Sequence, residues 1–179
     1  MSITPKTKPQ MTKPEVMVYL TNANISLEKT PVVVVGMRGY YANTFGVKNR
    51  NDRGFDDDAF FLITPRVFKS FNGNVDPSIK RSRIATLIAG IYKAVKWMHK
   101  GRYRGYQIVK DTVSRDGLKG LDTGRHGINF HKHQKNKTDS EGCQTLPESQ
   151  YPEFVECVDR ELDHYRQAEF IYLLIDKTK

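Results

Sequence analysis

The sequence has little cysteine and no long hydrophobic run, and each absence excludes a class of protein. Two cysteines in 179 residues are too few for the multi-disulfide framework of a small secreted domain. The longest clean apolar run, 31–37, has the length of a strand and falls far short of the roughly 20 residues that span a bilayer. Residues 1–16 contain lysines with no apolar stretch behind them, so we expect neither a membrane span nor a secretory signal peptide.

Acidic residues are also fewer than basic ones, 20 against 29, which gives a net charge of +9. Such a chain is attracted to polyanions, including nucleic acid, anionic lipid headgroups and cell-wall polymer. The 13 glycines and 8 prolines are dispersed, which excludes a collagen-like or wholly disordered chain. The apolar content suffices for one core, so we expect a flexible basic tail at 1–15 and a single domain at 16–179.

Apolar and β-branched runs predict a domain built mainly from strands. The segment 81–99 fits either a helix or a strand that starts near Gly90. A helix is expected from about Glu153, because apolar residues recur there on one face; Cys157 borders this face as a small buried hydrophobe. The fold class is therefore α+β and β-rich, with a mostly antiparallel sheet or sandwich core and one or two helices. Strands are expected at 31–36, 58–64, 106–113, 128–131 and 170–175, and another is expected to begin at 16–20.

Two further segments carry polar side chains of possible interest. The glycine-containing stretch 37–54 is expected to be a long loop, in which Arg38 and Tyr40 could recognise substrate carboxylates. The run of three aspartates at 56–58 could chelate a cation, but an exposed turn is the favoured interpretation.

The segment 127–147 holds the most reactive side chains. It places His131 at the end of a short expected strand and Cys143 in a turn that begins at Ser140. A thiol with a pKa of about 8.5 is mostly protonated at neutral pH, and a nearby imidazole can accept its proton to leave a nucleophilic thiolate. Gly142 allows a tight turn whose amides could stabilise an oxyanion. Neighbouring lysines are expected to lower the pKa of the thiol.

The order Gly-Ile-x-x-His, polar loop, Ser-x-Gly-Cys resembles the catalytic domain of YkuD-like L,D-transpeptidases. In that family a histidine on a strand precedes [Ser/Thr]-His-Gly-Cys, the domain is β-rich, and the cysteine attacks stem peptides of bacterial peptidoglycan at the carbonyl of meso-diaminopimelate. The resemblance implies that Cys143 is the nucleophile and His131 the base. It also implies that the amides of Glu141, Gly142 and Cys143 frame the oxyanion site, and that Ser140 matches the Ser/Thr of the motif. No metal and no cofactor are expected.

The match covers about 20 residues and departs from the family pattern at two places. Glu141 replaces the histidine before glycine, and Gln144-Thr145 replaces the usual asparagine or arginine near the cysteine. The spacer from His131 to Ser140 is also short. His126 would lengthen it and remains the alternative base, although its context fits the strand position less well. These features are similar to those of a divergent, phage-type branch of the family.

The resemblance implies acyl transfer from peptidoglycan stem peptides through a thioester, with hydrolysis preferred to transpeptidation. Without a signal peptide, the protein is expected to be made in the cytoplasm and to act at the bacterial cell wall or periplasm after release or delivery. A phage lysin, a virion-associated wall enzyme or a delivered effector fits this expectation.

Two alternatives depend on other features of the sequence. His126, His131, His133 and Cys143 offer ligands that zinc accepts, but they lack a standard zinc spacing. The net charge and the mixture of arginine and tyrosine at 100–106 would suit a nucleic-acid-binding protein without catalysis, although no recognised nucleic-acid-binding motif is present.

Overall fold

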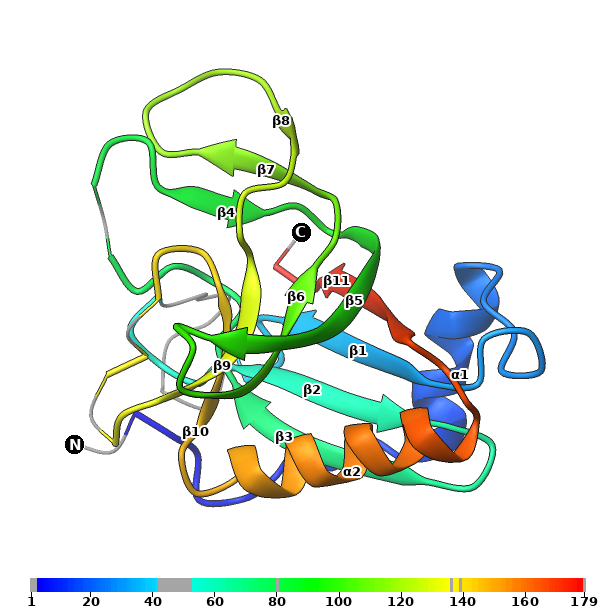
Figure 1. Cartoon of the computed structure of the whole chain (residues 1–179). Helices are drawn as coiled ribbons and strands as arrows, with labels where there is room; N and C mark the ends of the chain where they lie inside the picture. The colour runs from blue at the N-terminus through cyan, green and yellow to red at the C-terminus, as the bar shows by residue number, and fades with distance from the viewer. Residues whose placement is uncertain (1–2, 42–52, 80, 136, 139, 179) are drawn as a thin grey trace.

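The computed structural model describes residues 3–41, 53–79, 81–135, 137–138 and 140–178, which form a single β-rich domain with two helices (Figure 1). The helices are α1 (Lys13–Asn22) and α2 (Tyr151–His164), and the strands are β1 (Val33–Arg38), β2 (Asp58–Ile63), β3 (Phe68–Gly73), β4 (Ala85–Leu87), β5 (Gly90–His99), β6 (Tyr103–Ile108), β7 (Asp111–Arg115), β8 (Asp122–Gly124), β9 (Asn129–His133), β10 (Gln144–Pro147) and β11 (Glu169–Asp176). Neither helix in this part of the chain is long and apolar enough to cross a membrane.

Eight of the strands form one large sheet in the order β10-β9-β6-β5-β11-β1-β2-β3. The pairs β1–β11 and β9–β10 are parallel and the others are antiparallel. The two outer strands come together because Asn74, directly after β3, exchanges backbone hydrogen bonds of 2.9 and 2.8 Å with Thr145 of β10. The mostly antiparallel sheet is therefore confirmed, but it curls into a nearly closed barrel. A smaller sheet, β4-β7-β8, projects at the top of Figure 1.

The central strands β1 and β2 of the large sheet are buried on both faces. Every residue of β1 and β2 is buried, which explains why the sequence of β1 has no charged residue before Arg38 at its end. Val34 and Phe60 belong to the cluster that includes the apolar face of α2, whereas Val33 and Phe61 pack with α1. Cys157 is buried in the first cluster, so its interpretation as a small core residue is confirmed.

The N-terminal segment differs from the expected tail and strand. Ile3 is buried, and the side chain of Asn72 donates to the Thr7 carbonyl at 3.1 Å, so residues 3–12 lie against the domain. The expected strand at 16–20 is wrong, because this stretch lies in α1. The Thr12 amide donates to the Glu15 carboxylate at 2.6 Å, and this capping contact is typical of a helix start.

The segments with mixed patterns resolve into short strands. The ambiguous stretch 81–99 forms β4 and β5, so the strand that starts at Gly90 is the correct alternative. The expected strand 106–113 is split between β6 and β7, which belong to different sheets. In the expected loop 37–54, Arg38 ends β1, and residues 42–52 lie outside the described residues.

Candidate functional site

The parallel pair β9–β10 brings the predicted nucleophile and base to one face of the sheet. His131 lies opposite Thr145, and the Asn129 amide donates to the Cys143 sulfur at 3.4 Å, one position before β10 begins. Residues at alternate positions of a strand share a face, so His131 and Asn129 point the same way. Cys143 and His131 both line a cavity of about 380 Å³. The structure therefore brings together the two residues on which the sequence interpretation depends.

The imidazole of His131 has a defined tautomer. Its Nδ1 lies 2.8 Å from the carbonyl oxygen of Lys132. A carbonyl only accepts hydrogen bonds, so Nδ1 carries the hydrogen and Nε2 keeps its lone pair. Burial, together with the nearby His99 and Lys100, lowers the pKa of His131 to about 4. At neutral pH the ring is therefore uncharged and able to accept a proton at Nε2.

Cys143 is half-buried, and the net shift of the pKa of its thiol is upward. Burial raises the pKa, and this effect outweighs the lowering effects of the hydrogen bond from the Asn129 amide and of the Lys100 ammonium. Lys100 thus lowers the pKa of the thiol, as expected of a neighbouring lysine, but burial decides the net direction. Among the described residues no hydrogen bond joins the thiol to His131; the sulfur lies 3.8 Å from the Gly127 carbonyl oxygen. The free site holds a neutral thiol beside a neutral imidazole, and catalytic hydrogen bonds often tighten only when substrate binds.

The turn before Cys143 is held by Ser140 and needs glycine. Gly142 has a φ of +133°, and a Cβ there would lie 2.6 Å from the Ala85 carbonyl oxygen. The Gly142 amide donates to Ser140 Oγ at 3.0 Å, and this hydroxyl donates to the Cys143 carbonyl at 2.8 Å. The Gly142 amide already donates a hydrogen bond inside the turn. The expectation that this amide helps to frame an oxyanion site is therefore wrong. The amides of Glu141 and Cys143 have no hydrogen-bond acceptor among the described residues.

The side chain of Glu141 lies at the rim of the cavity. Its carboxylate is exposed and forms an ion pair of 3.0 Å with Arg81. It also raises the pKa of Cys143, because a negative charge disfavours the thiolate. Glu141 thus opposes ionisation of the thiol at a position where the resembled family has a histidine.

His126, the alternative base, lines the same cavity but is already engaged. Its Nδ1 contacts the Asp111 carboxylate and its Nε2 lies 3.0 Å from Asp122. Two carboxylate partners leave neither ring nitrogen free for the thiol proton, so the arrangement favours His131.

The other proposed zinc ligand, His133, is also occupied. Its Nε2 lies 2.8 Å from Asp56 and its Nδ1 lies 2.7 Å from the Gln134 carbonyl. Burial lowers the pKa of His133, but the Asp56 carboxylate outweighs it and the net shift is upward. Within the described ranges, no group of three or more His, Cys, Asp or Glu side chains could hold a metal ion.

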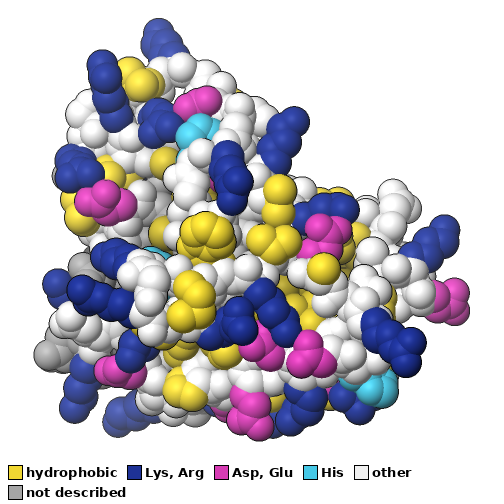
Figure 2. Space-filling model, in the orientation of Figure 1, with side chains coloured by type: hydrophobic (Ala, Val, Ile, Leu, Met, Phe, Trp, Pro, Cys, Tyr) yellow, Lys and Arg dark blue, Asp and Glu magenta, His cyan; other side chains and the backbone are white. Residues whose placement is uncertain are grey.

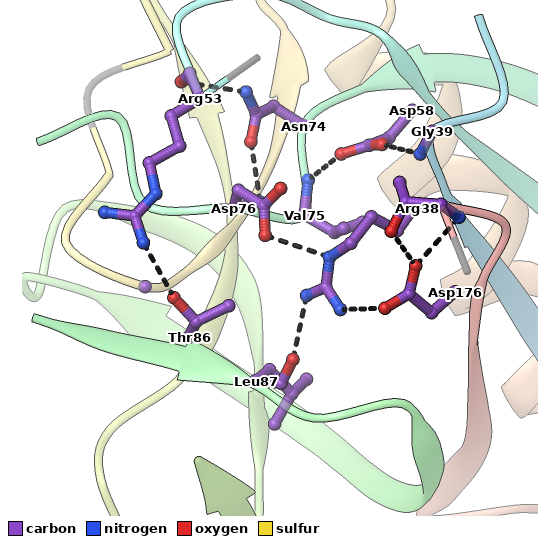
Figure 3. A network of polar contacts seen from close by, with 12 residues as sticks. Arg38, Gly39, Arg53, Asp58, Asn74, Val75, Asp76, Thr86, Leu87 and Asp176 are labelled. Atoms are coloured by element: carbon purple, nitrogen blue, oxygen red, sulfur yellow. Dashed lines mark hydrogen bonds and ion pairs between the residues drawn. The ribbon is translucent and has the colours of Figure 1, made fainter. Parts of the chain in front are cut away.

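Two other polar segments are structural rather than exposed. The aspartates at 56–58 are buried, so the expected exposed turn is wrong. Arg38 is buried too: it contacts Asp76 at 2.9 Å, Asp176 at 3.7 Å and the Leu87 carbonyl at 2.8 Å (Figure 3). It therefore links β1 to neighbouring segments and does not face a substrate. Tyr40 is half-buried, and its hydroxyl accepts a hydrogen bond from the Gln10 amide at 2.9 Å.

The aromatic part of the expected nucleic-acid surface is only partly accessible. Tyr106 is fully buried and its hydroxyl lies 3.0 Å from Asp159, so it cannot stack on a base. Lys100 and Arg102, in the turn between β5 and β6, are exposed.

His99 and Lys100 are site residues that the sequence analysis did not find. The His99 ring stacks on the His131 ring, with centroids 4.4 Å apart. His99 and Lys100 both line the cavity that contains Cys143. They come from the β5–β6 hairpin, and only the β6–β9 pairing brings them to His131. No local motif in the sequence marks them.

No protein-family model and no curated protein matches this sequence. The case for a function therefore depends on the geometry and chemistry of the site.

Proposed function

We propose that the protein is a cysteine acyl-transfer enzyme that acts on peptidoglycan stem peptides, with Cys143 as nucleophile and His131 as base. The observation that carries this proposal is the shared cavity, which is lined by the half-buried Cys143 and by His131, whose Nδ1 is bound to the Lys132 carbonyl. The resemblance of 127–147 to YkuD-like L,D-transpeptidases supplies the substrate class. The β-rich domain is compatible with that resemblance.

The first step forms a thioester. Substrate expels water from the cavity and brings a stem-peptide carbonyl to the Cys143 sulfur. The thiol proton moves to His131 Nε2 as the sulfur attacks the carbonyl carbon, and the carbonyl oxygen becomes an oxyanion. The amides of Glu141 and Cys143 are the candidate donors to this oxyanion. His131 then gives its proton to the leaving amine as the C–N bond breaks.

Proton transfer during attack suits the shifted pKa values. Because the pKa of Cys143 is raised and that of His131 is lowered, a separated thiolate–imidazolium pair is disfavoured in the free protein. The developing charges would instead be stabilised by each other and by oxyanion donors as the reaction proceeds.

The second step regenerates the thiol. Water loses a proton to His131 and attacks the thioester carbonyl, and the sulfur leaves and takes the proton back. An acceptor amine in place of water would give transpeptidation. We favour hydrolysis at the bacterial cell wall after release or delivery, as for a phage lysin or virion-associated enzyme, and the net charge of +9 favours binding to anionic envelope polymers.

Mass spectrometry of purified muropeptides tests the proposed function. The wild type is expected to convert a stem peptide to a product whose mass identifies the bond and separates hydrolysis from transpeptidation. Cys143→Ala is expected to give no product. Cys157→Ala is the matched control, because Cys157 is the other cysteine and lies buried in α2. Muropeptides left intact by the wild type, or equal conversion by Cys143→Ala, would contradict the proposal.

A further inference from the structure

A second cavity adjoins the one that contains Cys143. The two cavities share His99, Lys100 and His131 as lining residues. The second cavity, which Arg102 and Lys132 also line, is here called the basic recess. Its volume of about 230 Å³ is below the range of roughly 300–1,000 Å³ that is usual for sites of whole small molecules. It therefore suits one end of a larger ligand.

Positive charge exceeds negative charge in the basic recess. Glu148 is the acidic residue that lines it, and this carboxylate is paired with Lys132 at 2.8 Å. Lys100 and Arg102 form no ion pair with any residue in the described ranges. Figure 2 shows lysine and arginine side chains spread over the whole visible face, so charge alone does not distinguish this region. The distinguishing feature is that two such cations, both without an ion-pair partner among the described residues, line one cavity together with the candidate base His131.

The backbone at Lys100 is a second observation. Lys100 has a φ of +49° and the following Gly101 has a φ of +67°, in the turn that joins β5 to β6. This left-handed region favours glycine and asparagine, whereas a lysine there is conformationally unfavourable. The conformation of the turn therefore does not account for a lysine at this position. Arg83 and Arg166 also have a positive φ, so this conformation alone does not mark a site; Lys100 differs from them because it lines both cavities.

We propose that the basic recess binds a carboxylate of the stem peptide, with Lys100 and Arg102 as its binding residues. This rests on the proposed function, because it needs the reacting carbonyl in the adjoining cavity beside Cys143. Stem peptides carry free carboxylates close to their amide bonds, and the shared wall lets one peptide occupy both cavities. Charge-assisted hydrogen bonds from a guanidinium and an ammonium suit a carboxylate.

The carboxylate could belong to the residue that gives the acyl group or to the leaving residue. Three synthetic stem tetrapeptides separate these sources: one with all carboxylates free, one amidated at the side-chain carboxylate of the acyl residue, and one amidated at the C-terminal carboxylate. Their dissociation constants are measured by calorimetry with Cys143→Ala, which prevents turnover. The same constants are measured after adding Lys100→Gln, Arg102→Gln or Lys100→Arg. Lys29→Gln is the matched control, since Lys29 is exposed in the loop after α1 and lines neither cavity.

Amidation at one of the two positions is expected to weaken binding roughly tenfold to a hundredfold, the range for hydrogen bonds to charged groups. Lys100→Gln and Arg102→Gln are expected to weaken binding of the free peptide and to reduce the effect of that amidation. Lys100→Arg should retain the preference, and Lys29→Gln should not change it. Equal binding of all three peptides, or an undiminished preference in both glutamine variants, would overturn the proposal.

Turnover of the same peptides by the wild type separates this inference from the proposed function. Hydrolysis with equal kcat/KM for free and amidated peptides would overturn carboxylate binding by the recess and leave the acyl-transfer reaction standing. Selective binding without any turnover would support the recess and contradict the acyl-transfer reaction.

Discussion

At the scale of single residues, the candidate site depends on how burial changes two ionisable side chains. Burial keeps His131 uncharged and raises the pKa of Cys143, so the reactive pair is stored in its neutral form. The Lys132 carbonyl fixes which nitrogen of His131 is free. Cys143 and His131 could be proposed from sequence because the local motif carries both. The tautomer and the direction of the pKa shifts could not, because they depend on burial and on His99 and Lys100 from another hairpin.

The lowered pKa of His131 predicts a pH dependence of stability. In the unfolded chain the imidazole titrates near its ordinary value of 6.5, whereas in the folded protein its pKa is about 4. The unfolded state therefore binds more protons between these values. The stability that neutral His131 provides is complete above pH 6.5 and falls as the pH drops towards 4, by about 3 kcal/mol in total.

Urea unfolding at pH 7.5 and pH 4.5 measures this effect. When the pH is lowered from 7.5 to 4.5, the free energy of unfolding is expected to fall more for the wild type than for His131→Gln. This variant lacks the imidazole but keeps every other titratable group of the protein. An equal loss in the two proteins would contradict the burial of a neutral imidazole at this position.

At the scale of elements, the turn from Ser140 into β10 positions the nucleophile. The strands β1, β2 and β11 could be predicted because their apolar runs reflect burial in the sheet. The strands β4, β8 and β10 could not, since each has three or four residues and depends on partners distant in sequence. The sequence predicts that Gly142 allows a tight turn before Cys143. The close approach of the Ala85 backbone to Gly142 is a tertiary contact, and no feature of the neighbouring sequence indicates it.

Gly142→Ala is expected to destabilise the protein by roughly 2 kcal/mol or more. The new Cβ would meet the Ala85 backbone oxygen at 2.6 Å in addition to the strain of a positive φ. Gly120→Ala is the matched control, since Gly120 has a φ of +87° and nothing within 4 Å of the added Cβ. Urea unfolding should show a larger loss for Gly142→Ala. Equal losses would mean that the contact with Ala85 does not constrain the turn.

At the scale of the whole molecule, buried polar contacts tie the barrel to the smaller sheet. Arg38 at the end of β1 contacts Asp76, which lies shortly after β3, and the Leu87 carbonyl of β4 (Figure 3). This arrangement could not be predicted from the sequence, in which Arg38 was one residue that could recognise a substrate carboxylate. Its charge is instead neutralised inside the protein by segments that are far apart along the chain.

Arg38→Met is expected to lower the free energy of unfolding by about 3–5 kcal/mol, because it leaves Asp76 buried without its cation. Adding Asp76→Asn should recover part of that loss. The control is Lys93→Met, since Lys93 and Glu169 form an exposed pair and should contribute about 1 kcal/mol or less. A loss for Arg38→Met no larger than that for Lys93→Met would contradict a structural role for this network.

Trapping the thioester tests the central claim most directly. Wild-type protein is mixed with a stem tetrapeptide, quenched in acid, and analysed by intact-protein mass spectrometry followed by peptide mapping. The account predicts a mass increase equal to the acyl group, located on Cys143, present in Cys157→Ala and absent in Cys143→Ala. Peptide cleavage with no adduct dependent on Cys143, or an adduct that persists in Cys143→Ala, would contradict it.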